Sequence, residues 1–224
     1  AAYGSAGERC MAISVVVVVE EVADELCKLL HEKASALKIG PGNEAENEMG
    51  PLITNDHKNK VIDYIQQGAD SGAKILLDGR EHEVTNKPGF FLGPTLFDDV
   101  SPEMSIYKEE IFGPVLVVLR VKDFNAAIRL ANEHQFGNGV AIFTNQGSKA
   151  REFVHSVEVG MVGINVAIPV PLSFYTFGGW KDSIFGSSNI YGMDGIRFFT
   201  RTKTVTARWV DDDETINLSM PTVE

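Results

Sequence analysis

Short apolar runs alternate with amphipathic segments along most of the chain. Runs rich in β-branched residues predict strands at 13–19, 73–79, 113–121, 139–144 and 160–165. Amphipathic spacing predicts helices at 20–37, 55–71, 123–134 and 145–156, with Thr54 or Asn55 and Asp123 as N-caps. Strands that alternate with helices predict an α/β fold, a mainly parallel sheet flanked by helices. We expect the 13–19 strand to be buried on both faces.

The carboxy-terminal quarter has a different pattern. Residues 166–191 are rich in Pro, Gly, Ser and aromatic residues without periodicity, which is typical of functional or interface-forming segments. The stretch "KTVTARW" at 203–209 alternates apolar and polar residues and predicts a final strand that pairs with a neighbouring sheet for oligomerisation. We expect residues 1–209 to form one domain and 210–224, with acidic residues from Asp211 to Glu214, to form a mobile tail.

Charge restricts the kinds of partner. The 224 residues carry 20 Lys and Arg against 31 Asp and Glu, a net charge of −11 that repels nucleic acid and anionic membrane surfaces. The basic residues between Arg197 and Arg208 alternate with Thr, Phe and Val, as on a strand with one solvated face. No apolar run is long enough to span a bilayer. We therefore expect neither nucleic-acid nor membrane partners.

The two cysteines differ in their surroundings. Two are too few for a disulfide framework, so both are expected to be free thiols in a reducing compartment. Cys27 shares a predicted helix face with Ala23 and Leu30 and is expected to be structural. Cys10 lies in the small-residue loop "GSAGERCMA" before a strand, where the backbone can approach a ligand. From the residues alone, Cys10 is either a nucleophile or a buried structural cysteine.

Other chemistries lack their required residues. A Cys–His hydrolase needs a base, but the five histidines fall in predicted helices or polar loops without an Asn or Asp to orient them. No Cys-x-x-Cys or His-x-x-x-His spacing is present, so no metal site is predicted. The "GNG" at 137–139 leads into a strand, the wrong order for a dinucleotide-binding motif.

Three motifs together resemble the aldehyde dehydrogenase family. They are "GERCMA" around Cys10, "EIFGP" at 110–114 and "GGWKDS" at 178–183, and the likeness extends from residue 1 to about 209. Within the family, Arg9 before the cysteine, "INVAIPVPLSF" and "YGMDGIRFFTRTKTVTARW" resemble the methylmalonate-semialdehyde dehydrogenase branch. The usual Pro-Phe before Gly-Gly is Thr176-Phe177 here and the usual Gly after Ser is Ile184, which favours an atypical substrate.

The resemblance implies a role for each of four residues. Cys10 would attack the aldehyde, and the adduct would pass a hydride to NAD and become a thioester. Glu110 would accept hydrogen bonds from the nicotinamide ribose, and Phe112 would pack near the nicotinamide ring. Arg9 would bind the carboxylate of methylmalonate or malonate semialdehyde. Coenzyme A would then take the acyl group, with loss of CO2, to give propanoyl-CoA or acetyl-CoA.

The resemblance also implies properties of a longer enzyme. We expect the NAD-binding half to be absent from this chain, so the chain alone would be inactive. The enzyme would be a homo-oligomer, a dimer or tetramer, serving valine and inositol catabolism in the bacterial cytoplasm or the mitochondrial matrix. Two alternatives stay open: a hydrolytic aldehyde dehydrogenase that releases a free acid, and a non-catalytic assembly module.

Overall fold

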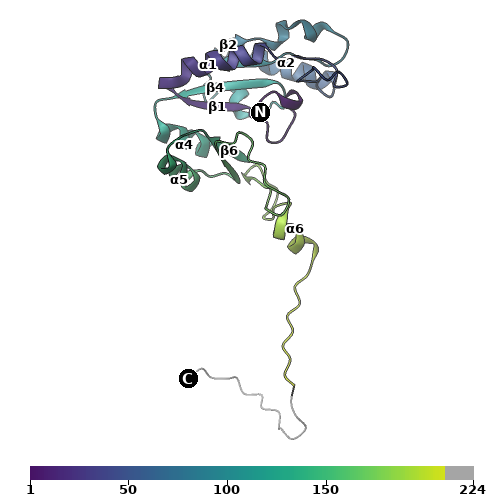
Figure 1. Ribbon diagram of the computed structural model, residues 1–224, viewed down its shortest axis with the longest axis vertical. Helices are drawn as coiled ribbons and strands as arrows, with labels where there is room; N and C mark the ends of the chain where they lie inside the picture. The colour runs from purple at the N-terminus through teal and green to yellow at the C-terminus, as the bar shows by residue number, and fades with distance from the viewer. Residues whose placement is uncertain (210–224) are drawn as a thin grey trace.

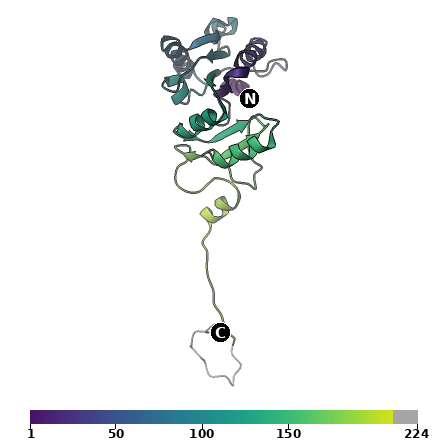
Figure 2. The same cartoon turned by 90° about the vertical axis from the view of Figure 1, so that its left-hand side faces the viewer.

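The computed structural model describes residues 1–209, which form two adjoining α/β lobes and an extended carboxy-terminal segment (Figure 1). The view turned by 90° shows the same order from the amino-terminal lobe to the extended segment (Figure 2). The acidic tail predicted at 210–224 lies outside the described residues.

A four-stranded sheet forms the larger lobe. Its order is β1 (Val15–Val19), β4 (Val115–Val121), β3 (Thr95–Asp98) and β2 (Lys74–Leu77). The pairs β1–β4 and β3–β4 are parallel, whereas β2 adds to β3 in the antiparallel direction. The prediction of an α/β fold with a mainly parallel sheet is confirmed.

Helices cover both faces of this sheet. Successive β4 side chains point to opposite faces, so they pack into two separate cores. Leu116 and Val118 pack in a core with Cys27 of α1 (Glu20–Ser35). Val117 and Leu119 pack in a second core that includes residues of α2 (Asn55–Asp70) and α3 (Ser105–Lys108). The short 3-10 helices η1 (Gly4–Gly7), η2 (Gly79–Glu81) and η3 (Glu83–Asn86) complete this lobe.

The smaller lobe has its own apolar core. It contains α4 (Phe124–Glu133), β5 (Phe136–Gly137), β6 (Gly139–Ile142), α5 (Gly147–Ser156), β7 (Met161–Ile164) and β8 (Trp180–Lys181). Strands β6 and β7 pair in parallel, and β5 pairs with β8 in the antiparallel direction. Buried Ile128 of α4 and Phe153 of α5 lie in one apolar core, against which side chains of β6 and β7 pack. Helix α6 (Gly192–Phe199) follows.

The predicted helix starts are confirmed at two caps. The Thr54 hydroxyl accepts a hydrogen bond from the backbone N–H of His57 at 3.1 Å. The Asp123 carboxylate accepts one from the backbone N–H of Ala126 at 2.8 Å. Each side chain satisfies an N–H that the first helical turn leaves without a partner.

Two predicted strands differ from the structure. Strand β1 begins at Val15 and lies at the edge of its sheet, so of its five valines only Val18 is buried, and the prediction of burial on both faces was wrong. The stretch 203–209 forms no strand within the described chain, because a strand requires a hydrogen-bonding partner and this segment runs away from both sheets (Figure 1). Helix α6 was not predicted.

Among residues 1–209, no helix has the length and apolar character needed to cross a membrane.

Candidate active site

Cys10 lies on a turn between η1 and β1, and its side chain is exposed. The structure therefore contradicts the reading of Cys10 as a buried structural thiol, whereas Cys27 is buried as expected. Residues Ser5, Ala6 and Gly7 adopt φ values of 53°, 53° and 74°. Such left-handed conformations are unfavourable for Ser and Ala, so surrounding contacts must hold this turn in place.

One of those contacts joins the cysteine turn to the 110–114 segment. A Cβ added at Gly7 would overlap the carbonyl of Gly113, so the two backbones touch. A Cβ added at Gly113 would in turn meet Val61 of α2 at 2.6 Å. The "GERC" and "EIFGP" motifs, distant in sequence, therefore lie against each other and against α2.

Glu110 and Phe112 follow α3 and precede β4. Tyr64 donates its hydroxyl hydrogen to Glu109 at 2.6 Å, and this bond raises the pKa of Tyr64 to about 12. The neighbouring Glu110 is exposed, and within residues 1–209 it has no hydrogen bond or ion pair. Phe112 is 39% exposed with φ at 56°. An exposed carboxylate can accept hydrogen bonds from ligand hydroxyl groups, and an exposed aromatic ring offers an apolar surface to a planar ligand ring.

Arg9 is exposed next to Cys10. Its Nε donates a hydrogen bond to the Ser5 hydroxyl at 2.9 Å. No carboxylate in the part of the chain that the structure describes pairs with this guanidinium. Its two terminal nitrogens can therefore bind a ligand carboxylate in the two-point arrangement that guanidinium groups favour.

The side chain of Asn138, between β5 and β6, holds the cysteine turn from the smaller lobe. Its Nδ2 donates to the Cys10 carbonyl at 3.0 Å and to the Met11 sulfur at 3.2 Å. Sequence reasoning considered this asparagine only as part of a "GNG" phosphate motif. Only the tertiary fold places it beside the cysteine, and no local pattern indicates that contact.

The "GGWKDS" segment supports Asn138 structurally. Its β8 pairs with β5, and the Ser183 hydroxyl accepts a hydrogen bond from the backbone N–H of Gly137 at 3.1 Å. The Lys181 ammonium donates to three carbonyl oxygens at the end of α4, where a positive charge is favourable: Ala131 at 3.4 Å, Asn132 at 2.7 Å and His134 at 3.1 Å. This motif therefore orders the backbone around Asn138 and brings no reactive side chain to Cys10.

A buried carboxyl group lies two residues before the cysteine. The Glu8 side chain is only 8% exposed, and His57 Nε2 lies 3.6 Å from its oxygen. Burial raises the pKa of Glu8, while the Ile53 backbone N–H and the nearby His57 imidazole oppose that rise. Sequence reasoning assigned no role to either Glu8 or His57.

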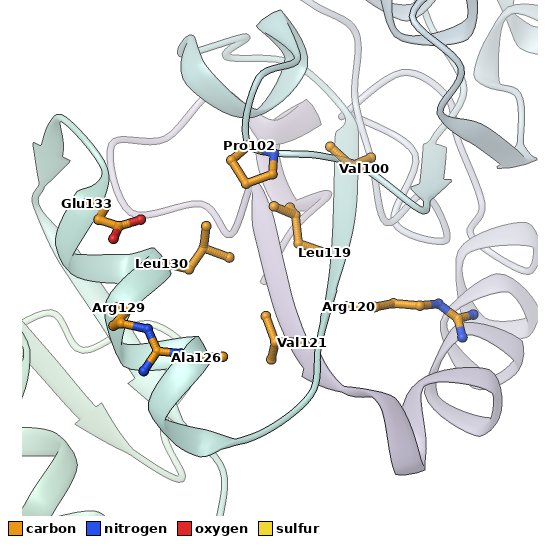
Figure 3. A pocket seen from close by; sticks show the side chains of 9 residues that line it. All are labelled: Val100, Pro102, Leu119, Arg120, Val121, Ala126, Arg129, Leu130 and Glu133. Carbon is orange, nitrogen blue, oxygen red and sulfur yellow. The ribbon is translucent and has the colours of Figure 1, made fainter.

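The cavity between β4 and α4 is separate from these groups (Figure 3). Its wall includes Leu119, Val121 and Leu130, with Arg129 and Glu133 at the α4 side. None of its lining residues belongs to the Cys10 turn or to 110–114. Within the described residues, no group of three or more His, Cys, Asp or Glu side chains could hold a metal ion.

Residues 1–205 match the aldehyde dehydrogenase family. The chain is 54% identical to malonate-semialdehyde dehydrogenase of Pseudomonas aeruginosa, covering 93% of this chain and 42% of that protein. It is 48% identical to malonate-semialdehyde dehydrogenase 2 of Bacillus thuringiensis, covering 93% and 43%.

Two solved structures share the fold. Methylmalonate-semialdehyde dehydrogenase from Oceanimonas doudoroffii is 50% identical, with a TM-score of 0.91 over 94% of this chain and 43% of that one. A Sinorhizobium meliloti protein complexed with NAD, provisionally named methylmalonate-semialdehyde dehydrogenase, is 49% identical with a TM-score of 0.90, again covering 94% and 43%. The chain thus spans less than half the length of these relatives.

Proposed function

Since this chain belongs to the aldehyde dehydrogenase family, we propose that it is the catalytic part of an NAD-dependent, CoA-acylating dehydrogenase for methylmalonate or malonate semialdehyde. Relatives at about half identity carry malonate-semialdehyde and methylmalonate-semialdehyde dehydrogenase names, which supports this substrate class. Because the chain spans 42% to 43% of those relatives, we propose that it is inactive without the remaining part of the enzyme.

The observation that carries the proposal is the packing of the Cys10 turn against the 110–114 segment through Gly7 and Gly113. This packing brings an exposed thiol into the same neighbourhood as an exposed carboxylate and aromatic ring. A nucleophile must lie close to the hydride acceptor, because hydride transfer requires near contact of the reacting atoms. Bound NAD would supply that acceptor.

In the proposed reaction, the Cys10 thiolate adds to the aldehyde carbon and forms a carbon–sulfur bond. The carbonyl oxygen becomes an oxyanion, which the backbone N–H of Cys10 would stabilise. Loss of hydride from that carbon oxidises the adduct to a thioester. The hydrogen bond from Asn138 to the Cys10 carbonyl fixes the backbone on which both the thiol and the N–H depend.

Arg9 is proposed to select aldehydes that carry a carboxylate. The Ser5 hydrogen bond anchors Nε and leaves the two terminal nitrogens for the substrate. The substrate carboxylate would leave as CO2, and its bonding electron pair would stay on the adjacent carbon, which takes up a proton. The CoA thiolate would then attack the thioester carbonyl and form the new carbon–sulfur bond, and Cys10 would leave as a thiolate. A thiolate attacks a thioester far better than water does, which favours acyl transfer over hydrolysis when CoA is bound.

We further propose that the enzyme is a homo-oligomer and that the carboxy-terminal segment contributes to its contacts. Aromatic side chains there are exposed to an extent that is unusual for a folded protein, with Phe185, Phe199 and Trp209 at 102%, 85% and 95%. The remaining part of the enzyme or a second copy would cover them.

Two alternatives make different predictions. A hydrolytic aldehyde dehydrogenase would use the same Cys10 thioester but release a free acid. A non-catalytic assembly module would not need the exposed thiol of Cys10, and that exposure favours catalysis.

The test uses a full-length enzyme, meaning a protein of the relatives' length that contains this chain. Malonate semialdehyde, NAD and CoA are supplied, and NADH, acetyl-CoA and free acid are measured together. The proposal predicts one acetyl-CoA for each NADH. Free acid in place of acetyl-CoA would favour the hydrolytic alternative, and absence of NADH would favour the assembly module.

A further inference from the structure

His57 links the nucleophile turn to the proposed cofactor segment. It lies in the first turn of α2, and its Nε2 is 2.7 Å from the carbonyl oxygen of Phe112. Because a carbonyl oxygen only accepts hydrogen bonds, Nε2 must carry the hydrogen. The same Nε2 is 3.6 Å from the Glu8 carboxyl oxygen. The imidazole therefore touches both segments.

Phe112 needs such a tether because its backbone is strained. Its φ of 56° is in the left-handed region, which is unfavourable for a residue with a Cβ and persists only where the surroundings enforce it. Ile111 before it is buried, and Gly113 after it contacts Gly7 and Val61. The His57 hydrogen bond is made to the carbonyl of Phe112 itself. Without this hydrogen bond, the Phe112 carbonyl would have no side-chain hydrogen-bond partner among residues 1–209.

Glu8 places the other end of this link at the nucleophile. Its side chain is 8% exposed, compared with 22% for His57, so the pair is largely shielded from water. A shielded carboxylate attracts the Nε2 hydrogen and favours the tautomer that bonds to Phe112. Glu8 is also two residues before Cys10 and follows Gly7 directly.

We infer that Glu8 and His57 are positioning residues that hold Phe112 and Glu110 in the orientation needed for the nicotinamide end of NAD. The inference rests on the proposed function, because it assigns those two residues to NAD. It adds that the cofactor segment is aligned with Cys10 by a side-chain link as well as by backbone packing. Neither Glu8 nor His57 needs to touch the cofactor.

The test uses the full-length enzyme without cofactor and measures hydrogen exchange of the peptide spanning 109–117 by mass spectrometry, because the backbone N–H groups of Glu109, Val115 and Val117 flank 110–114 and donate hydrogen bonds. His57→Phe removes the N–H donor, and faster exchange by at least threefold is expected. His57→Gln keeps a donor and should restore slow exchange. Glu8→Gln should give an intermediate rate. His155→Phe, at an exposed position near the end of α5, is the matched control and should leave exchange unchanged.

NAD binding is then measured by calorimetry on the same variants, with Cys10 alkylation as a check on the nucleophile. His57→Phe should raise the NAD dissociation constant about tenfold and change the alkylation rate less than twofold. Unchanged exchange in His57→Phe overturns the inference. Faster exchange with unchanged NAD affinity also overturns it, because the orientation of Phe112 and Glu110 would then not affect NAD binding. A wild-type enzyme that binds no NAD overturns the proposed function, and the exchange result still decides whether the link holds 110–114.

Discussion

The side-chain amide of Asn138 donates a hydrogen bond to the backbone carbonyl of Cys10 at 3.0 Å, joining the smaller lobe to the turn that carries the thiol. Asn138 directly follows β5, whose pairing with β8 in the 178–183 motif and whose hydrogen bond from the Gly137 N–H to the Ser183 hydroxyl fix the adjacent backbone. The position of the Cys10 thiol therefore depends on both lobes.

The first prediction follows from that bond. Asn138→Ala in the full-length enzyme should lower kcat roughly five- to tenfold, since losing one such hydrogen bond costs about 1 kcal/mol. Asn47→Ala is the matched control, because Asn47 makes the same kind of bond to the Pro41 carbonyl at 3.0 Å. Steady-state kinetics of both variants provide the test. An equal loss of kcat in the two variants would show that Asn138 affects kcat only through the stability of the protein.

The second prediction concerns the contact of Gly7 with Gly113. Gly7→Ala should destabilise the protein by more than about 2 kcal/mol, because it combines left-handed strain with a backbone clash. Gly72→Ala is the control, since φ there is 93° but a Cβ would meet nothing within 4 Å. That variant should lose only about 1 kcal/mol. Denaturant unfolding measures both, and similar costs would argue against tight packing of the two motifs.

The third prediction tests Arg9 as the carboxylate-binding residue. Arg9→Leu should cost about 2 to 4 kcal/mol in transition-state binding of malonate semialdehyde, the range for leaving a desolvated charge unpaired. Propanal has no carboxylate, so its transition-state binding should weaken much less. The ratio of kcat/KM values for the two aldehydes is the measurement. An equal loss for both would assign Arg9 to the turn through its Ser5 bond.

The fourth prediction concerns acid stability. Asp98 is buried and accepts two hydrogen bonds from Arg120, at 3.0 and 2.7 Å, which hold its pKa below the ordinary value of 3.8. The unfolded chain therefore takes up this proton first as pH falls. The contribution of Asp98 to stability is fully present above pH 3.8 and is lost as pH falls through the lower folded pKa.

Asp98→Asn should accordingly lower the free energy of unfolding at pH 7 by about 1 to 3 kcal/mol. The difference from wild type should shrink below pH 3.8. Asp63→Asn, at an exposed position of α2, should show no such difference at any pH. A gap for Asp98→Asn that stays constant down to pH 2 would show that its pKa is not lowered.

Local patterns in the sequence were sufficient to predict most of the regular elements. The alternating apolar runs and the caps at Thr54 and Asp123 depend on neighbouring residues, and both caps are present in the structure. The burial of β1 could not be predicted, because its place at the sheet edge is a property of strand order. The 203–209 strand was predicted from alternation alone, which cannot say whether a partner strand is present.

The residues of the candidate site also fall into two groups, those indicated by local motifs and those placed by tertiary contacts. Motifs predicted Cys10, Arg9, Glu110 and Phe112 as site residues, and the structure brings the two segments that carry them together through Gly7 and Gly113. Asn138 and His57 were missed because each bonds a backbone carbonyl far away in the sequence. Such contacts are set by tertiary packing, for which residue type and spacing contain no signal.

The most direct test of Cys10 as the nucleophile is the NADH burst on rapid mixing of full-length enzyme, NAD and malonate semialdehyde without CoA. About one NADH per active site should form quickly, followed by slow turnover that CoA accelerates, because hydride transfer precedes acyl release. Cys10→Ser should abolish the burst, whereas Cys27→Ser, at the buried thiol of α1, should keep it. A full burst in Cys10→Ser would contradict the assignment of Cys10 as the nucleophile.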